Sequence, residues 1–474
     1  MDTNCDGYQG CIGTPIKAAA PDGTMSGDDM IYDMVTTPPA QPGYDGMTFA
    51  VGARNADIVG SKFPNTHSDV LFWTRGPMGS VKNWSDRFTF TANFQNMGIA
   101  FGSGVARNPN TNETIIVGNI LNGKLAVQLK PQIDASVAQN AFIAIMDDAG
   151  NAKIAMPIGT NVIANSGVVA KGVAVDKAGN IYVVGNYLGM PGFGDPIPAP
   201  QTTSANGFVV SYTETGAFRW QRFFTGSWDQ SIDAIRVNEA DEIFIAGRFA
   251  GTVYFTLNGA AGWLNPSGNS DVLLAKIEDN ELPDKAGSAI WAVRVGGDDD
   301  DFVGGLAASK DGVALAGMFR GTVTIGNFGV TSGDSIPYWD AFVATFDKSN
   351  GSPKAATAIV ANGMQLIQAV AVDSFGDIVI AGAYSSTLPS NAGTLVTSGM
   401  NDFDAFVVKI GPNFTALWAK DFGDTLDQAA HAIVIGPTTG HVIIGGGFQG
   451  ALDGFTVAPP NANGFDAFIG ELAN

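Results

Sequence analysis

The chain has 474 residues, of which 45% are hydrophobic and only 15% charged, and its formal net charge is −20. This acidity argues against a nucleic-acid-binding surface, which needs clustered basic residues, and against docking on anionic lipid. No run of about 18 apolar residues is present, so the sequence predicts no membrane-spanning helix.

Residues 1–13 are expected to form a separate polar tail. Asp2, Asn4 and Asp6 have the spacing of the first half of a calcium-binding loop, although the distal bidentate acid is missing. Cys5 and Cys11 could form a disulfide if the protein is exported. The tail is either a metal site or a disulfide-pinned or disordered segment, and we favour the second interpretation. No signal peptide opens the chain, and we expect an export segment to precede residue 1.

Short apolar runs bounded by Gly, Pro, Asn or Asp follow along the chain, as expected for strands joined by tight turns. One marker, a polar residue followed by two apolar ones, recurs at intervals of roughly 62 to 71 residues. Its copies begin at Asp69, Asn140, Asn206, Asp271, Asp340, Asp404 and Asp466. Three further runs accompany the marker. Seven units of four strands predict an all-β fold, a seven-bladed β-propeller with four-stranded antiparallel blades.

The repeats begin and end out of phase. The last marker run, which starts at Asp466, is not followed by an outermost strand, whereas a spare run of that kind stands at residues 15–20. We therefore predict that blade 7 is built from residues 430–472 plus 14–20, so that an N-terminal strand closes the ring like a velcro strap. Residues 14–474 would then form one domain without an open edge between its end blades.

The repeat resembles the bacterial SBBP-type β-propeller repeat. The matching residues are 172–176, 179–185, 404–410, 418–423 and Asp427. The resemblance spans roughly residues 31–472 and implies a propeller that is secreted or displayed on the outer surface of a bacterium. It implies no activity, because the family is defined by its repeat.

Acidic side chains occupy the turns that should lead into the innermost strands. They are Asp229, Asp427 and the run Asp298, Asp299, Asp300 and Asp301. Carboxylates around the mouth of a central channel could bind Ca²⁺, or they could accept hydrogen bonds from turn amides. We favour the turn role for Asp229 and Asp427. For the run of four, both interpretations stay open, because adjacent carboxylates repel one another unless a cation or solvent compensates.

Three tryptophans fall in the long connections that should share one face of the propeller. Trp228, Trp263 and Trp339 could stack on sugars or anchor a protein partner, or each could fill its own loop. Trp228 and Trp263 flank blade 4 and lie near Asp298 to Asp301. The sequence therefore favours a binding patch on blades 4 and 5.

No catalytic motif accompanies this scaffold: the sequence lacks a nucleophile elbow, a phosphate loop, CxxC and HExxH. We expect a non-enzymatic binding or structural module at the cell surface, with a protein or glycan partner, within a larger extracellular assembly. Ca²⁺ is the one candidate cofactor. The alternatives are a carbohydrate-binding propeller that uses the loop tryptophans and a hydrolase or lyase with an acidic pocket at the channel mouth.

Overall fold

The computed structural model describes fifteen stretches of the chain, in which strands predominate. They are residues 15–19, 28–37, 46–56, 69–76, 81–92, 98–136, 138–160, 166–195, 197–280, 282, 285–332, 338–397, 402–453, 455 and 464–473. Within these stretches the helical segment is one short 3₁₀ turn, Ser85–Arg87. No helix in them has the length and apolar character needed to cross a membrane.

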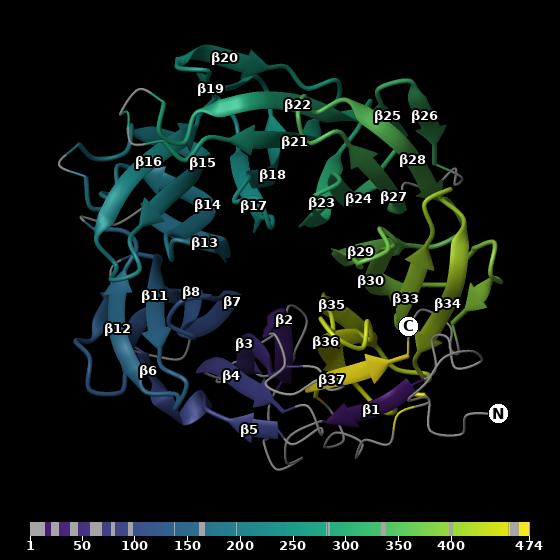
Figure 1. Ribbon diagram of the computed structural model, residues 1–474, viewed down its shortest axis with the longest axis horizontal. Helices are drawn as coiled ribbons and strands as arrows, with labels where there is room; N and C mark the ends of the chain where they lie inside the picture. The colour runs from purple at the N-terminus through teal and green to yellow at the C-terminus, as the bar shows by residue number, and fades with distance from the viewer. Residues whose placement is uncertain are drawn as a thin grey trace.

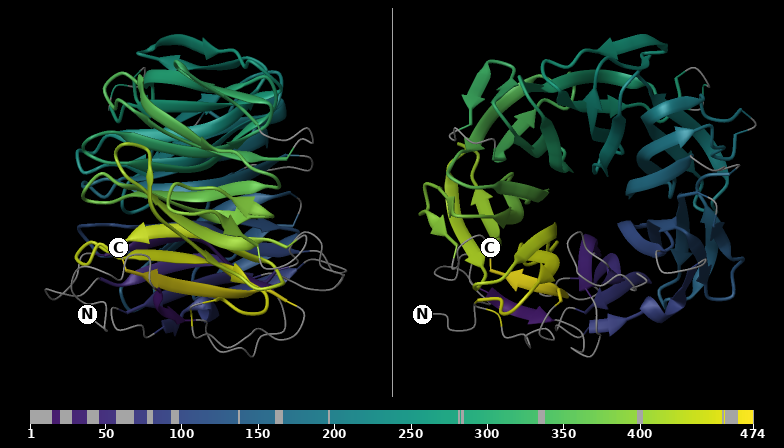
Figure 2. Two further views of the ribbon diagram at one scale, coloured as in Figure 1. Left: turned by 90° about the vertical axis from the view of Figure 1, so that its right-hand side faces the viewer. Right: turned by 180° about the vertical axis from the view of Figure 1, so that it is seen from behind.

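Antiparallel sheets with four main strands stand side by side in a ring, as Figure 1 shows along the axis and Figure 2 from the side and from behind. Each sheet runs from an innermost to an outermost strand. The first three are β2 (Asp28–Thr36), β3 (Thr48–Ala56), β4 (Asp69–Arg75), β5 (Val81–Asn83); β7 (Ile99–Arg107), β8 (Thr114–Leu121), β11 (Asn140–Met146), β12 (Ala152–Pro157); and β13 (Gly167–Val175), β14 (Ile181–Gly189), β15 (Thr202–Tyr212), β16 (Phe218–Phe224).

The ring continues in the same order through the rest of the chain. The next sheets are β17 (Gln230–Val237), β18 (Ile243–Ala250), β21 (Ser270–Ile277), β22 (Ala289–Gly297); β23 (Asp301–Ala308), β24 (Val313–Phe319), β27 (Asp340–Phe346), β28 (Pro353–Ile359); β29 (Gln365–Val372), β30 (Ile378–Tyr384), β33 (Asp404–Ile410), β34 (Ala416–Phe422); and β35 (Gln428–Ile435), β36 (Val442–Phe448), β37 (Asp466–Leu472), β1 (Pro15–Ala19). This is a β-propeller architecture built from a sequence repeat.

The recurring sequence markers meet across the two middle strands of each sheet. Gly118 of β8 pairs with Phe142 of β11, and Gly317 of β24 pairs with Phe342 of β27. A Cβ on either glycine would stand 2.6 Å from the facing phenylalanine ring, so only glycine leaves room for it. Every residue of β11 is buried. Sheets packed on both faces explain why these strands are apolar throughout instead of alternating.

The ends of the chain meet where the ring returns to its start. The innermost strands β2, β7, β13, β17, β23, β29 and β35 each contact the next, and β35 contacts β2. β1 pairs antiparallel with β37, with Ala19 opposite Ile469. Arg75 of β4 forms a buried ion pair with Glu471 of β37. Main-chain pairing and this ion pair therefore join segments from opposite ends of the sequence.

Several connections that the sequence suggests are loops contain strands of their own. The long connection before β21 holds the hairpin of β19 (Val253–Leu257) and β20 (Ala260–Leu264), and corresponding connections hold β25 (Thr322–Ile325) with β26 (Phe328–Thr331) and β31 (Thr387–Leu388) with β32 (Leu395–Val396). A further small sheet joins β6 (Phe88–Ala92), β9 (Gly123–Val127) and β10 (Ile133–Ala135). Asn258 and Gly259 have φ of 49° and 80°, the geometry of a two-residue type I′ hairpin turn.

Candidate functional site

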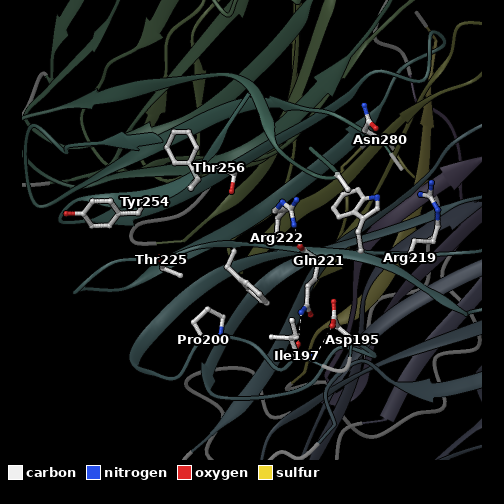
Figure 3. Close-up of a pocket in the computed structure, with 14 residues that line it drawn as sticks. Asp195, Ile197, Pro200, Arg219, Gln221, Arg222, Thr225, Tyr254, Thr256 and Asn280 are labelled. Carbon is white, nitrogen blue, oxygen red and sulfur yellow. Dashed lines mark hydrogen bonds between the residues drawn. The ribbon is translucent and has the colours of Figure 1, made fainter. Parts of the chain in front are cut away.

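A cleft of about 810 Å³ lies on the outer rim of the ring, between β16 and the hairpin β19–β20 (Figure 3). Tyr254 stands at one end of the cleft in this view, Arg219 stands at the other, and Arg222 lies between them. Asp195, Gln221 and Asn280 add further polar groups to the lining. The cleft therefore combines cationic, amide and aromatic side chains along the outermost strand of one sheet.

The two walls of the cleft are tied together at one end. The main-chain N–H of Thr225 donates to Tyr254 O at 2.9 Å, and the N–H of Tyr254 donates to Thr225 O at 2.7 Å. The rings of Phe224 and Phe255 stack at 5.8 Å with an interplanar angle of 27° beside this bridge. The hairpin is thereby fixed against the neighbouring sheet.

A network of polar side chains fixes the other end. The carboxylate of Asp279 accepts two hydrogen bonds from Arg219, at 3.0 and 2.9 Å, and one from Trp220 Nε1 at 2.7 Å. Tyr182 Oη donates to the same carboxylate at 2.9 Å. Burial alone would raise the pKa of Asp279, but these donors outweigh it and lower that pKa. Arg219 is therefore already neutralised in place.

The hairpin carries two exposed aromatic side chains next to the cleft. Tyr254 and Trp263 face each other across β19 and β20, and they are 54% and 61% exposed. The main-chain groups of Tyr254 bond to Thr225, so this is a non-hydrogen-bonded cross-strand pair, the kind whose side chains approach most closely. Trp228 is 67% exposed and lies over Gly251, near the start of the hairpin. Two of the three predicted loop tryptophans thus present large apolar area to solvent near one cleft.

Trp339 lies elsewhere and is half-buried. Its ring packs edge-on to Phe302 with centroids 4.8 Å apart, and the guanidinium of Arg320 sits 4.0 Å from its centre. Both contacts lie within one sheet and its connections. The ring of Trp339 therefore fills its own surroundings, unlike Trp228 and Trp263.

Three members of the acidic run hold neighbouring segments through hydrogen bonds. Asp298 accepts from the Thr322 N–H at 2.6 Å, Asp299 from Asn269 Nδ2 at 2.8 Å, and Asp300 from Ser270 Oγ at 2.6 Å. These contacts tie the run to β25 and to the start of β21, and the turn role and the cation site that the sequence left open both stay predictions.

Asp301 differs from the other three because it is fully buried as the first residue of β23. Its Oδ2 accepts from the Gly297 N–H at 2.9 Å, whereas its Oδ1 has no hydrogen-bond partner among the described residues. The buried Asp271 carboxylate faces it across Gly296 and also has an Oδ1 without a partner there. Burial raises the pKa of Asp301 to about 8, and the negative charge of Asp271 adds to the shift although the Gly297 bond opposes it. A carboxyl that looks exposed in the sequence is thus a buried acid that holds its proton at neutral pH.

Asp229 and Asp427 occupy equivalent turns and make equivalent contacts. Asp229 Oδ1 accepts from the Ala205 N–H at 2.9 Å, and Asp427 Oδ1 accepts from the Phe403 N–H at 3.0 Å. Over the described parts of the chain, no three His, Cys, Asp or Glu side chains are grouped so that they could hold a metal ion. The predicted metal ligands Asp2, Asn4 and Asp6, and the predicted disulfide partners Cys5 and Cys11, lie outside the described residues.

Sequence reasoning missed a ring of bulged residues on the innermost strands. The pairing register of each of these strands skips one residue at an equivalent position, and that of β2 skips Asp29 as well. The residues at the equivalent position are Tyr32, Ser103, Lys171, Asp233, Gly304, Gln368 and His431. Neighbours in this set touch: Tyr32 lies edge-on to His431 at 5.9 Å, and Lys171 Nζ is 3.8 Å from Asp233 Oδ1. Burial lowers the pKa of His431 to about 4, so its imidazole is neutral at pH 7. Aligning the repeats residue by residue would have shown that this position carries no common side chain.

Comparisons with known proteins identify no family for this chain. No family model matches the chain. An uncharacterised WD repeat-containing protein of Acanthamoeba polyphaga mimivirus is 22% identical over 378 residues, which is 67% of this chain and 27% of that protein. The chain therefore corresponds to about a quarter of the length of this relative.

Solved structures resemble the chain only in outline. The Dos1 propeller has a TM-score of 0.47 at 9% identity, with 97% of this chain and 95% of that one covered. A protein of unknown function from Dyadobacter fermentans has a TM-score of 0.40 at 11% identity, with 81% and 99% covered. A Synechocystis apocarotenoid oxygenase variant has a TM-score of 0.43 at 9% identity, with 94% and 96% covered. Similarity of this extent says nothing about what the chain binds.

Proposed function

We propose that this protein is a seven-bladed β-propeller, closed by its N-terminal strand, that acts as a non-enzymatic module for binding another protein. The pairing of β1 with β37 and the ring of innermost strands support the blade count and the closure. The observation that carries the function is the exposed pair of Tyr254 and Trp263 beside the rim cleft. Large aromatic side chains next to a concave surface are typical centres of protein interfaces.

The rim position suits this role because the hairpin is rigid before any partner arrives. Its base is fixed by the main-chain bonds between Thr225 and Tyr254 and by the stack of Phe224 on Phe255. A preorganised aromatic surface loses little conformational entropy on binding. The hairpin also lacks charged residues from Thr252 to Ser270, although the whole chain carries −20, so a partner can approach it without burying an unpaired charge.

The test is affinity capture with matched variants. The chain is immobilised as wild type, as the double variant Tyr254→Ala/Trp263→Ala, and as Phe375→Ala, which removes an aromatic side chain that is 80% exposed on another sheet. Proteins retained from the source cells are quantified by mass spectrometry. We expect a partner that wild type and Phe375→Ala retain equally and that the double variant retains at least about tenfold less. Equal retention by all three would rule out the hairpin as the docking surface.

Carbohydrate binding is the second candidate, and the same two aromatic rings favour it because sugars stack on exposed Trp and Tyr faces. Titration with neutral and acidic oligosaccharides, followed by tryptophan fluorescence, separates the two functions. Unchanged fluorescence, together with no signal on a glycan array, would remove this candidate.

The cellular setting and the cofactor remain parts of the proposal. Secretion to the outer surface of a bacterium rests on the resemblance to SBBP-type repeats. Calcium binding is proposed for Asp2, Asn4 and Asp6, because Asp229 and Asp427 already accept hydrogen bonds from the main-chain N–H groups of Ala205 and Phe403. A protein at the cell surface would meet millimolar Ca²⁺, which matches the weak sites of extracellular modules.

A further inference from the structure

A groove of about 380 Å³ lies between two neighbouring sheets of the ring, the one that begins with β23 and the one that begins with β29 (Figure 1). Val313 and Phe346 line it from the first sheet, and Val372, Ile378 and Phe414 line it from the second. All its lining residues lie within the described part of the chain, and most of them are apolar. Its volume is in the usual range for small-molecule sites, about 300 to 1,000 Å³.

The corresponding junction between the sheets that begin with β7 and β13 is filled. Gly179 and Gly376 hold equivalent turns, each with its N–H bonded to the carbonyl of the residue three positions before it. A Cβ on Gly179 would stand 2.9 Å from Asn108 Nδ2 and 3.0 Å from Glu214 Oε2, whereas a Cβ on Gly376 would have no described atom within 4 Å. Two polar side chains therefore occupy a space that stays open beside Gly376, which lines the groove.

Shorter residues at two repeat positions account for the open space. Asn108 directly follows β7 and Ser309 directly follows β23, while Glu214 and Pro412 are the second residues after β15 and β33. Ser309 and Pro412 both line the groove, and they are the counterparts of Asn108 and Glu214. Neither can extend a polar group across the junction as Asn and Glu do. This junction therefore lacks the two side chains that fill the other one.

The backbone of Phe414 is strained where the repeat has glycine. Phe414 has φ of 58°, a left-handed conformation that is uncommon for a bulky residue. Its N–H closes a turn onto the carbonyl three residues earlier, as the N–H groups of Gly150 and Gly216 do in the corresponding turns, with φ of 73° and 80°. Glycine adopts this conformation readily, whereas strain in other residues is concentrated at functional sites. The strained residue here lines the groove.

Lys354 supplies a hydrogen-bond donor to the lining of the groove. Its Nζ donates to Asp311 O at 3.2 Å and stands 3.6 Å from Asp347 Oδ2. An ammonium group has three N–H donors, so it can still donate to an acceptor on a ligand. The carboxylate of Asp311 is paired with Lys310 at 2.5 Å, and that of Asp347 with Lys354. The charges at the groove therefore balance, and the net charge of −20 on the chain disfavours an anionic ligand.

We propose that the groove binds a small, uncharged, apolar molecule that carries one oxygen acceptor, such as a ketone. The apolar body of the ligand would pack on Phe346 and Phe414, and its oxygen would accept a hydrogen bond from Lys354 Nζ. An apolar cavity of about 150 Å³ holds benzene, so this groove has room for roughly two aromatic rings. The groove shares no lining residue with the rim cleft. Binding there would add a small-molecule function to the proposed protein-binding one.

Three naphthalene compounds are the probes, and each is titrated into the full chain. Acetylnaphthalene carries a carbonyl acceptor, ethylnaphthalene has nearly the same shape without an acceptor, and naphthoate carries a negative charge. Their dissociation constants are measured by ligand-detected NMR. We expect acetylnaphthalene to bind about threefold or more tightly than either of the other two, because only its carbonyl gains a hydrogen bond without adding a charge.

Variants taken from the repeat itself test the location of the site. Phe414→Gly restores the glycine of the corresponding turns and should keep the fold while weakening acetylnaphthalene about tenfold or more. Ser309→Asn/Pro412→Glu restores the side chains that fill the other junction and should weaken it to a similar extent. Lys354→Met should bind acetylnaphthalene and ethylnaphthalene equally. Lys153→Met is the matched control, because Lys153 is the second residue of β12 as Lys354 is of β28, and it should change none of the three affinities.

Several results would overturn the inference. Acetylnaphthalene that does not bind at all, or that binds Phe414→Gly and the double variant as tightly as wild type, would show that the groove is not its site. Should Phe414→Gly fail to fold, the double variant decides the question alone. Tighter binding of naphthoate that is lost in Lys354→Met would mean that the ligand is an anion instead. None of these results bears on protein binding at the hairpin β19–β20.

Discussion

Single residues that break the repeat are the most informative positions in this chain. The innermost strands β17, β29 and β35 begin with the buried glutamines Gln230, Gln365 and Gln428. β23 begins with the equally buried Asp301. An amide needs no proton to stay neutral in this position, whereas a carboxyl does. The difference makes Asp301 the place where the stability of the fold should depend on pH.

We predict that Asp301 makes the folded state less stable as pH rises. Its pKa is about 8 in the fold, against 3.8 for an ordinary aspartate, so the unfolded state releases its proton first. Stability from this group is complete below about pH 4, falls by at most about 1.4 kcal/mol per pH unit, and levels off above pH 8. Asp301→Asn should remove this fall, as measured by urea unfolding between pH 5 and pH 9.

The matched control for that measurement is Asp229→Asn, which removes an acid from the equivalent turn of the neighbouring sheet. The fall in stability between pH 5 and pH 9 that Asp301 produces should persist in this variant, because Asp301 is unchanged. An identical slope for wild type and Asp301→Asn would show that Asp301 ionises normally and that the acid pair with Asp271 is not buried as described.

The sequence identified these acids as candidates, but it did not predict which of them is buried. The run from Asp298 to Asp301 reads as four equivalent surface acids, because spacing alone cannot show that β23 begins at the fourth. Burial follows from where the strand begins relative to its neighbours. The exposed positions of Trp228 and Trp263 were within reach of the sequence, since both fall between apolar runs. The rim cleft was not, because it forms only where the hairpin β19–β20 meets β16 in the fold.

At the scale of elements, β1 from the start of the chain takes the outermost position in the sheet of β35, β36 and β37. β1 covers the edge of β37, and Arg75 of β4 reaches Glu471 of the same strand. Burial opposes ionisation of Glu471, but the hydrogen bond from His441 and the charge of Arg75 outweigh it and lower its pKa to about 2. The charge pair is therefore intact at neutral pH, and together with β1 it connects the first and last sheets.

We predict that removing β1 destabilises the ring and exposes the unpaired main-chain groups along the edge of β37. A chain that starts at residue 28 should melt about 5 °C or more below the full chain and should associate through the uncovered edge of β37. Calorimetry and light scattering after size exclusion measure both effects. A chain that starts at residue 15 keeps β1 and should behave as the full chain does. Equal melting temperatures for all three would mean that the β1–β37 pairing adds nothing to stability.

The elements most accessible to sequence reasoning were those set by the repeat. Marker runs predicted the middle strands well, because a Gly facing a Phe across two buried strands leaves a strong pattern. The sequence repeat places the hairpin β19–β20 in a long connection without strands, although Asn258-Gly259 between apolar runs is a known hairpin signal. Its regularity was hidden by the repeat, which assigns no strand to that connection.

At the scale of the whole molecule, the dominant feature is the excess of acids. The chain holds 45 Asp and Glu against 25 Lys and Arg, and several of the described acids are used as acceptors in turns. Their mutual repulsion is long-ranged at low salt and should weaken as the Debye length falls from about 10 Å at 0.1 M to about 3 Å at 1 M. We therefore predict that the melting temperature rises steadily with NaCl over this range.

Divalent cations then distinguish screening from a bound ion. If the described turns hold no calcium, a chain that starts at residue 15 should melt at the same temperature in CaCl₂ and MgCl₂ of equal ionic strength, and EDTA should not lower it. Calcium that binds Asp2, Asn4 and Asp6 should appear only with the full chain, as heat in a Ca²⁺ titration. Free Ca²⁺ at a hundred times the dissociation constant of a specific site would stabilise the folded state by about 2.7 kcal/mol. In the shortened chain, such a site would give a higher melting temperature in CaCl₂ than in MgCl₂, an excess due to binding. Such an excess would place a calcium site within the ring itself and would contradict the assignment of Asp229 and Asp427 to their turns.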